Sequence, residues 1–335
     1  MAPLAAGLPP WLAAQLKSLL GQRGHAWLLQ GPSGLGQYTL ALELARAWLC
    51  DAPSADGACG QCTSCHSIDV RTHADLCVLM PEALMLDLAW PLDEKTQKEL
   101  DEKKRKPSRE IKVEAARDMV AFTQLTRSRG PTKAVLVYPA ERMNPIAANA
   151  LLKTLEEPPG DVKFVLATRA ADQLLPTIRS RCQAHTMSWP DSQAATAWLG
   201  AQGIATADAP LLLRAAGGRP EDALEFARSG RDATRWPLIP SAVARGEAIV
   251  FKDWTPAQAV DALQKLCHDL MAAGVGAKPL FFEPADLPPP PGAVVLSRWA
   301  KALFETSRTV EHPFNAGLML EALVSQAQIA INSKR

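Results

Sequence analysis

Short apolar runs alternate with helical patterns in the first half of the chain. Four runs predict strands that are buried on both faces of a sheet: 25–31, 75–80, 133–138 and 162–168. Three segments with apolar residues spaced three or four apart predict helices: 39–50, 112–125 and 144–159. Strands that alternate with helices favour a parallel sheet with helices on both faces, an α/β fold.

The second half is helical in pattern from about Ser192 onward. In the segment 255–274, Thr255 is a suitable N-cap and Pro256 occupies the first helical position. Its predicted apolar face consists of Ala259, Val260, Leu263, Leu266, Cys267 and Leu270. The segments 294–304 and 315–331 repeat this style, so an all-α part follows the α/β part.

The segment 144–159 carries the same helix signals. Asn144 is the expected N-cap, Pro145 is the first helical residue, and Pro158 and Pro159 end the helix. Its predicted apolar stripe is Ala148, Leu151, Leu152 and Leu155. This places the helix between the third and fourth predicted strands, with one face against the sheet.

One segment, 93–110, looks inserted, with seven basic and six acidic residues and almost no apolar content. We expect a solvated, mobile excursion here. A DNA grip by Lys103 to Lys106 is the less favoured alternative.

Composition narrows the class of protein. The chain has 335 residues, 47% of them hydrophobic, and a formal net charge of +1. This charge does not mark a nucleic-acid binder. Its apolar runs fall short of the roughly 20 residues that span a bilayer, so no membrane partner is expected. The N-terminal segment lacks the basic start of a signal peptide, which favours a cytoplasmic protein.

Four of the seven cysteines lie in one short stretch: Cys50, Cys59, Cys62 and Cys65. In a chain without a secretion signal, such clustering favours a metal over disulfides. Four thiolates match the tetrahedral preference of zinc and leave no open position, so we predict a structural zinc knuckle at 50–65.

A phosphate-binding loop is suggested by residues 31–38, GPSGLGQY, between a predicted strand and helix. Gly31, Gly34 and Gly36 fit such a loop, but Gln37 replaces its lysine and Tyr38 its Ser or Thr. The lysine contacts the β- and γ-phosphates, and the hydroxyl binds magnesium. We therefore expect no ATP hydrolysis and neither ATP nor Mg²⁺ as cofactor.

The strand that should carry the magnesium-binding acid supports this view. Pro139 and Ala140 stand where adjacent acidic residues are expected, and Glu141 follows one step too late. Both the phosphate-binding loop and the magnesium-binding strand therefore lack the residues that an ATPase needs.

Three segments give the chain its family resemblance: ANALLKTLEEPP (148–159), FVLAT (164–168) and TIRSRC (177–182). Together with the degenerate loop and the cysteine knuckle, they resemble the bacterial DNA polymerase III clamp-loader family, specifically a member that does not bind ATP. The resemblance implies a RecA-like AAA+ domain at 1–188 with the knuckle and the polar insertion. It further implies a small helical lid at 189–230 and a helical collar at 231–335 for oligomerisation.

The resemblance also implies roles for individual residues. Ser180, Arg181 and Cys182 match the family's SRC motif, whose arginine reaches the ATP of a neighbouring subunit, so Arg181 is the candidate arginine finger in trans. The simpler alternative is a surface arginine paired with a local carboxylate. ATP-binding members have an arginine in the lid where this chain has Glu221, with Arg219 two residues earlier.

The implied partners are the gamma/tau ATPase subunits and the delta subunit in a pentameric ring, the sliding clamp, and primer-template DNA through the assembled complex. Two other functions are less consistent with the sequence. An ATP-hydrolysing, gamma/tau-like AAA+ protein needs the missing loop lysine and acids. A zinc-dependent DNA-binding module would need basic residues near the knuckle, yet 51–69 contains no Lys or Arg.

Overall fold

The computed structural model describes residues 8–310 and 315–333. The chain divides into two compact units, Met1–Ala194 and Ala195–Arg335. In the described part of the chain, no helix is both long and apolar enough to cross a membrane.

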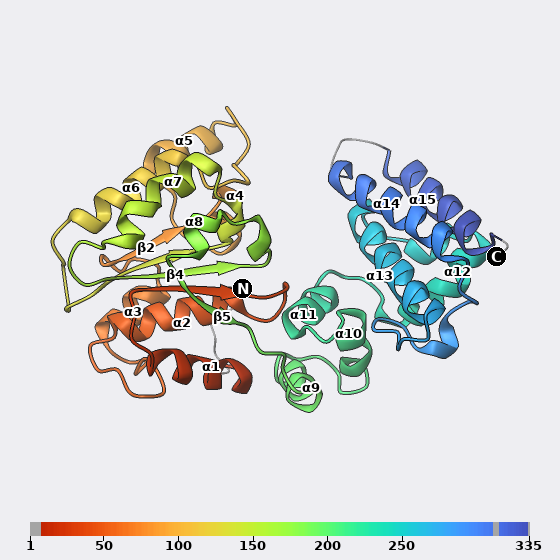
Figure 1. Cartoon of the computed structure of the whole chain (residues 1–335), viewed down its shortest axis with the longest axis horizontal. Helices are drawn as coiled ribbons and strands as arrows, with labels where there is room; N and C mark the ends of the chain where they lie inside the picture. The colour runs from red at the N-terminus through yellow and green to blue at the C-terminus, as the bar shows by residue number, and fades with distance from the viewer. Residues whose placement is uncertain (1–7, 311–314, 334–335) are drawn as a thin grey trace. The chain divides into compact units, whose positions relative to one another are not determined.

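The first unit is built on a five-stranded sheet in the order β2-β3-β4-β1-β5, in which every neighbouring pair is parallel (Figure 1). Its strands are β1 (Ala26–Gln30), β2 (Leu76–Leu79), β3 (Lys133–Val137), β4 (Val162–Thr168) and β5 (Gln183–Thr186). The predicted fold class, an α/β domain with a parallel sheet followed by an all-α part, is confirmed.

Helices cover both faces of this sheet. They are α1 (Pro10–Leu20), α2 (Gln37–Leu49), α3 (Thr63–Asp69), α4 (Glu82–Asp87), α5 (Glu94–Asp101), α6 (Val113–Gln124), α7 (Pro145–Glu156) and α8 (Pro176–Arg179). Two short 3₁₀ turns complete the unit, Ala140–Arg142 and Ala171–Gln173. Alternate residues of the strands face opposite sides, because side chains alternate along a strand. Val165 thus joins the core with α1 and α2, and Phe164 the core with α6 and α7.

Helix α7 forms as its sequence signals predict. The Asn144 side chain accepts a hydrogen bond from the Ala147 amide at 2.8 Å. Leu151 and Leu155 are fully buried against the sheet, whereas Leu152 is only partly buried. The helix ends at Glu156, just before the two prolines.

The second unit is all-helical. Its helices are α9 (Ser192–Ala201), which begins in the first unit, α10 (Ala209–Ala215), α11 (Pro220–Arg228), α12 (Ile239–Arg245), α13 (Pro256–Gly274), α14 (Ala293–Thr309) and α15 (Ala316–Ile331). Three 3₁₀ segments connect them, Ala233–Leu238, Ala248–Phe251 and Pro284–Asp286. One apolar core joins residues of both predicted helical domains, with Phe226 edge-on to Trp236 at 5.6 Å. The lid and collar boundaries themselves stay predictions.

Helix α13 shows the predicted pattern in full. Thr255 and Gln258 form a reciprocal capping box, each side chain bonding the other residue's backbone amide. All six residues of the predicted apolar face are buried in the core of the unit. Amphipathic spacing and capping were therefore sufficient to define this helix.

Strand β5 was not predicted. Three of its four residues are polar and three are exposed, which fits an edge strand that pairs only with β1 among the described strands. Nothing in its composition distinguishes it from a loop, so only its pairing with β1 reveals it.

Most residues of the 93–110 segment are exposed, as expected of a solvated excursion, but part of the segment has regular structure. Its mobility stays a prediction. Residues Glu94–Asp101 form helix α5, capped by the Asp93 side chain. Arg105 then binds Glu99 at 2.8 Å and makes two hydrogen bonds to Glu82. These contacts link the insertion to α4, and the sequence pattern could not reveal them because the partners are distant in the chain.

Candidate functional site

The loop after β1 connects a strand directly to a helix, as a phosphate-binding loop does. It runs from Gly31 to Gly36 and leads directly into α2. Gly34 and Gly36 have φ angles of 76° and 91°, which glycine adopts without strain. Gly31 lies so close to Met187 that an added Cβ would be 3.0 Å from the methionine Cβ. The predicted loop position and its glycine requirement thus have a structural basis.

Gln37, at the position of the missing lysine, is turned onto its own loop. Its side chain is only 2% exposed, and its Nε2 donates hydrogen bonds to the carbonyl oxygens of Gly31 at 2.8 Å and Pro32 at 2.5 Å. The neutral Gln37 amide therefore supplies hydrogen bonds to carbonyl groups of its own loop. It offers no charge to a phosphate outside.

Tyr38, at the position of the magnesium-binding hydroxyl, points into the core. The ring is 5.4 Å from that of Tyr138, and its hydroxyl accepts a hydrogen bond from Trp90 Nε1 at 2.8 Å. Burial raises the pKa of Tyr38, although the Trp90 hydrogen bond partly offsets this. Its hydroxyl is used in the core and not at the surface of the loop.

The segment after β3 also lacks the expected acids. Ala140 is fully buried, and Glu141 accepts a hydrogen bond from Thr168 Oγ1 at 2.8 Å. The Glu141 carboxylate also accepts the Arg169 amide and lies 3.8 Å from the Arg169 guanidinium. Glu141 thus links the segment after β3 to the end of β4. Its carboxylate is occupied by these contacts within the chain and has a structural role.

In the second unit, the two residues singled out at the predicted lid motif lie at the start of α11. Glu221 is in the first turn of the helix, and Arg219 precedes it. Arg219 Nε binds Asp222 Oδ2 at 2.6 Å, an ion pair within the helix terminus. The Arg219 guanidinium is therefore bound to a carboxylate of its own helix.

Arg181, the candidate finger, follows α8 on the surface of the first unit. Its Nε and Nη2 donate to Glu156 Oε2 at 3.0 and 2.7 Å, and its Nη1 donates to the Thr177 carbonyl at 3.1 Å. The arginine side chain is 29% exposed and that of Glu156 is 59% exposed. The last residue of α7 thus holds the guanidinium of the SRC motif.

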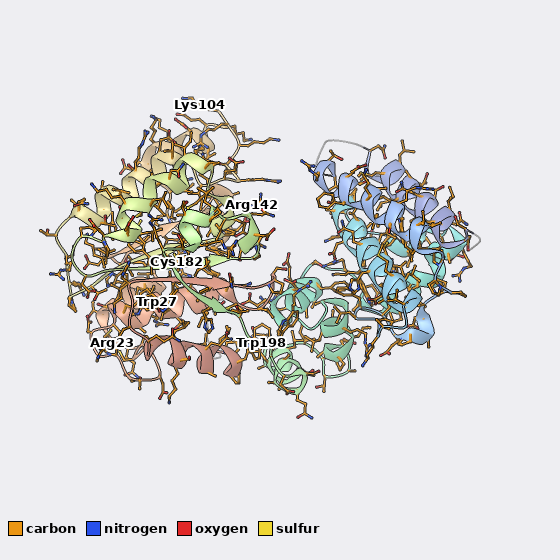
Figure 2. The ribbon with its side chains drawn as sticks, viewed as in Figure 1. Arg23, Trp27, Lys104, Arg142, Cys182 and Trp198 are labelled. Carbon is orange, nitrogen blue, oxygen red and sulfur yellow. The ribbon has the colours of Figure 1, made fainter. Side chains whose placement is uncertain are left out.

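The two neighbours of Arg181 in the motif have local roles. Ser180 Oγ donates to the Thr177 carbonyl at 3.1 Å. Cys182 packs partly buried against the apolar cluster beneath α7 and is labelled in Figure 2. Burial raises the pKa of the Cys182 thiol to about 12, so it is a thiol and not a reactive thiolate.

The four clustered cysteines meet in space. Cys50 ends α2, Cys62 caps α3, Cys65 lies within α3, and Cys59 comes from the connection between the helices. Their sulfur atoms all lie within 4.8 Å of one another. The Cys50 sulfur is 3.8 Å from that of Cys62 and 3.7 Å from that of Cys65. Sulfurs bound to one tetrahedral zinc at about 2.3 Å would be about 3.8 Å apart, so the cluster can hold such an ion.

Backbone amides support the sulfurs. The Cys59 amide donates to Cys50 Sγ at 3.2 Å, and the Cys65 amide donates to Cys62 Sγ at 3.4 Å. Amides of Gln61 and Cys62 lower the pKa of the Cys59 thiol to about 6, whereas burial raises that of Cys65 to about 12. Gly60, with φ of 74°, makes the sharp turn between the ligands.

Arg46 of α2 is a residue of this cluster that sequence reasoning missed. Its side chain is 15% exposed, and it binds Asp69 at 2.9 Å and Glu43 at 3.5 Å. Its Nε is buried and has no hydrogen-bond partner among the described residues. Its place four residues before Cys50 was the available signal, because residues one helical turn apart share a face.

The comparisons with known proteins agree on one family. The family model described as DNA polymerase III, delta subunit matches residues 12–190. The chain is 39% identical over 196 residues to the DNA polymerase III subunit delta' of Pseudomonas aeruginosa, covering 58% of this chain and 53% of the relative. It is 34% identical over 221 residues to the Escherichia coli subunit of the same name, covering 64% and 59%. The match therefore spans a little over half of each relative.

A search of solved structures gives a gamma subunit-related protein of DNA polymerase III from Thermotoga maritima, with 17% identity and a TM-score of 0.46, covering 96% of this chain and 100% of that one. The family model covers more than half of the chain and includes the degenerate loop, the cysteine cluster and the SRC motif. The chain therefore belongs to the DNA polymerase III delta subunit family.

Proposed function

We propose that the chain is a subunit of the DNA polymerase III clamp loader that does not hydrolyse ATP. The observation that carries this proposal is the way Gln37 and Tyr38 are used. Both side chains at the catalytic positions of the loop are buried and bonded within the chain itself. The fold of an ATPase domain is kept, while the groups that would bind phosphate and magnesium serve its packing.

We further propose that Arg181 acts in trans on the ATP of a neighbouring gamma/tau subunit. A guanidinium on the γ-phosphate stabilises the charge that develops in the transition state, an effect of about 10³ to 10⁵ in rate in related switches. In the single chain, Arg181 binds Glu156 at a partly exposed position. Exposed ion pairs contribute about 1 kcal/mol or less, so a phosphate can replace the carboxylate at small cost.

Glu156 has a positioning role in this proposal. It holds the guanidinium at the end of α7 before a nucleotide-bearing neighbour arrives, and the Thr177 carbonyl holds the other side. These contacts restrict the rotamers that the arginine side chain can adopt. The Arg181–Glu156 contact thus brings the LLKTLEEPP and SRC motifs together in space.

The cysteine cluster is proposed as a structural zinc site held by Cys50, Cys59, Cys62 and Cys65. Bound zinc would supply a cross-link between the end of α2 and α3 and no catalytic chemistry, because four thiolates fill a tetrahedral ion. The sulfur spacing supports this assignment.

The proposed partners are the gamma/tau and delta subunits in a pentameric ring, which opens the sliding clamp and places it on primer-template DNA. We expect this assembly in the cytoplasm. A DNA-binding role for the cysteine cluster itself is disfavoured, since 51–69 has no basic residue.

The test is reconstitution with purified gamma/tau and delta subunits of the same species. The chain should enter the complex in a fixed stoichiometry on size-exclusion chromatography, and alone it should not turn over ATP. A wild-type chain that hydrolyses ATP alone, with loss of the activity on Gln37→Ala, would contradict the proposal. So would a folded chain that stays outside the complex.

A further inference from the structure

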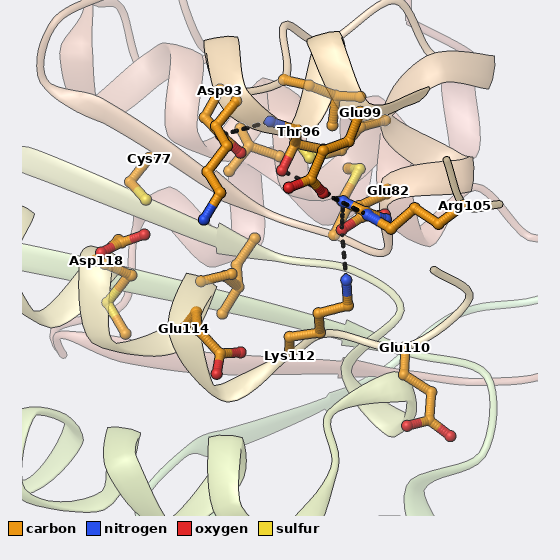
Figure 3. A pocket seen from close by; sticks show the side chains of 18 residues that line it. Cys77, Glu82, Asp93, Thr96, Glu99, Arg105, Glu110, Lys112, Glu114 and Asp118 are labelled. Atoms are coloured by element: carbon orange, nitrogen blue, oxygen red, sulfur yellow. Dashed lines mark hydrogen bonds and ion pairs between the residues drawn. The ribbon is translucent and has the colours of Figure 1, made fainter. Parts of the chain in front are cut away.

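A cavity of about 740 Å³ lies beside the edge of the sheet, apart from the sites discussed above. Its walls are β2, the start of α6 and the inserted helix α5 (Figure 3). Residues 77–80 of β2 form its apolar part. This size falls in the range of pockets that hold ligands or peptide segments.

The strand in this wall has an open edge. β2 is the last strand of the sheet and pairs only with β3 among the described strands. The carbonyls of Asp75 and Leu79 accept hydrogen bonds from the amides of Ala134 in β3 and Tyr138 just after it. Because backbone groups alternate sides along a strand, the N–H and C=O of Val78 face the opposite side, toward the open edge. Such an edge can accept another strand.

The charge around the cavity is negative. Six carboxylates and three cationic side chains line it, a formal net charge of −3. Arg105 and Lys112 are already paired with Glu82, and Arg105 also with Glu99. By contrast, the exposed carboxylates of Glu114 and Asp118 have no hydrogen bond or ion pair within the described chain.

The two carboxylates are arranged to meet a strand. Glu114 and Asp118 lie one turn apart on α6, across the cavity from Asp93 and Thr96 of α5 (Figure 3). Their separation along the helix axis is about 6 Å. Alternate side chains of an extended strand, which point to one side, are spaced about 6.8 Å apart. Two cationic side chains of one strand can therefore face both carboxylates.

We propose that this cavity binds an extended, basic segment of a partner protein, which adds as a strand to β2. Its main chain would bond to the open edge at Val78, and alternate Lys or Arg side chains would pair with Glu114 and Asp118. A metal ion is not the occupant we favour. In the described residues, the four cysteines form the one group of three or more potential ligands close enough to share an ion.

The inserted helix α5 gains a role in this proposal. The network of Glu82, Glu99 and Arg105 fixes α5 as the outer wall of the cavity. The inference is independent of the ATP-site and arginine-finger proposals, because it uses none of their residues.

The test uses the full chain and a fluorescent, end-blocked heptapeptide of sequence Thr-Lys-Val-Lys-Val-Lys-Thr. Fluorescence anisotropy should show saturable binding that weakens with salt, and the same peptide with Glu in place of Lys should not bind. The variant E114Q/D118N should weaken binding at least fivefold. The matched control E157Q/D172N removes two exposed charges of the same unit that do not line the cavity, and it should leave binding within twofold.

A second probe separates strand addition from simple charge attraction. The same peptide N-methylated at its alternate, edge-facing residues keeps all its charges but loses the hydrogen-bond donors, and it should lose most of its affinity. The unmodified peptide should also slow amide exchange at Val78. Equal weakening by E157Q/D172N, or equal binding of the methylated peptide, would overturn the proposal.

Discussion

The use of Tyr38 as a core residue makes a quantitative prediction. In an active loop of this type the position holds Ser or Thr, so Tyr38→Thr restores the residue that the chemistry requires. In this chain the same change removes a ring that is 6% exposed and packed near Tyr138. It also removes the acceptor of the Trp90 indole hydrogen bond.

The expected cost follows from these contacts. Truncating a buried aromatic side chain costs about 3–5 kcal/mol, and leaving a buried donor unpaired costs about 1–3 kcal/mol. Threonine keeps part of the volume, so we expect Tyr38→Thr to lower the free energy of unfolding by about 3–5 kcal/mol in total. Tyr38→Phe, which keeps the ring and removes only the hydroxyl, should cost about 1–2 kcal/mol.

Native-state hydrogen exchange of the β1 and β3 amides measures this free energy for the first unit alone, without assuming that both units unfold together. The double variant Q37K/Y38T should then be less stable than wild type and still fail to hydrolyse ATP. A cost below about 1 kcal/mol for Tyr38→Thr, or ATP turnover by the double variant, would refute the view that these side chains serve packing.

Three other predictions concern the cysteine cluster and the insertion. Elemental analysis should find about one zinc per chain, lost in Cys62→Ser but kept in Cys77→Ser; a folded wild-type chain without metal would contradict the site. Arg46→Met should speed zinc release to a chelator about tenfold, since it removes the ion pair that ties α2 to Asp69 at the end of α3. An unchanged release rate would exclude this supporting role. Burial would raise the pKa of Glu82, but hydrogen bonds from Arg105, Lys112 and the Ser108 amide outweigh it and lower the pKa to about 2. The stabilisation of the folded chain by Glu82 should thus be complete above about pH 4.5 and be lost as the pH falls toward 2. NMR titration should show a higher Glu82 pKa in Arg105→Ala than in the wild type. Equal Glu82 pKa values in the two chains would contradict the network.

The sequence predicts the elements whose signals are local. The capped helices α7 and α13 and the strands β1, β3 and β4 follow from end signals and periodicity within a few residues. Strand β5 and the anchoring of α5 were missed, because both depend on partners far away in the chain. Short polar edge strands and ion-paired insertions leave no periodic trace.

The candidate site divides in the same way. The four cysteines were recognisable from spacing, and the structure adds that their sulfurs converge. The replacement of the loop lysine was visible in the sequence, but the folding of the Gln37 amide onto its own loop carbonyls was not. Nor could the sequence pair Arg181 with Glu156, since 25 residues and a strand separate them.

The most direct test of the central claim is the ATPase rate of the reconstituted complex carrying Arg181→Ala. Arg179→Ala is the matched control, because Arg179 lies two residues away, is exposed, and belongs to α8. The account predicts that both variants enter the complex, that Arg179→Ala keeps the rate within twofold, and that Arg181→Ala lowers it by at least tenfold. An Arg181→Ala complex that assembles and hydrolyses ATP at the wild-type rate would contradict the claim that this chain supplies a catalytic arginine to its neighbour.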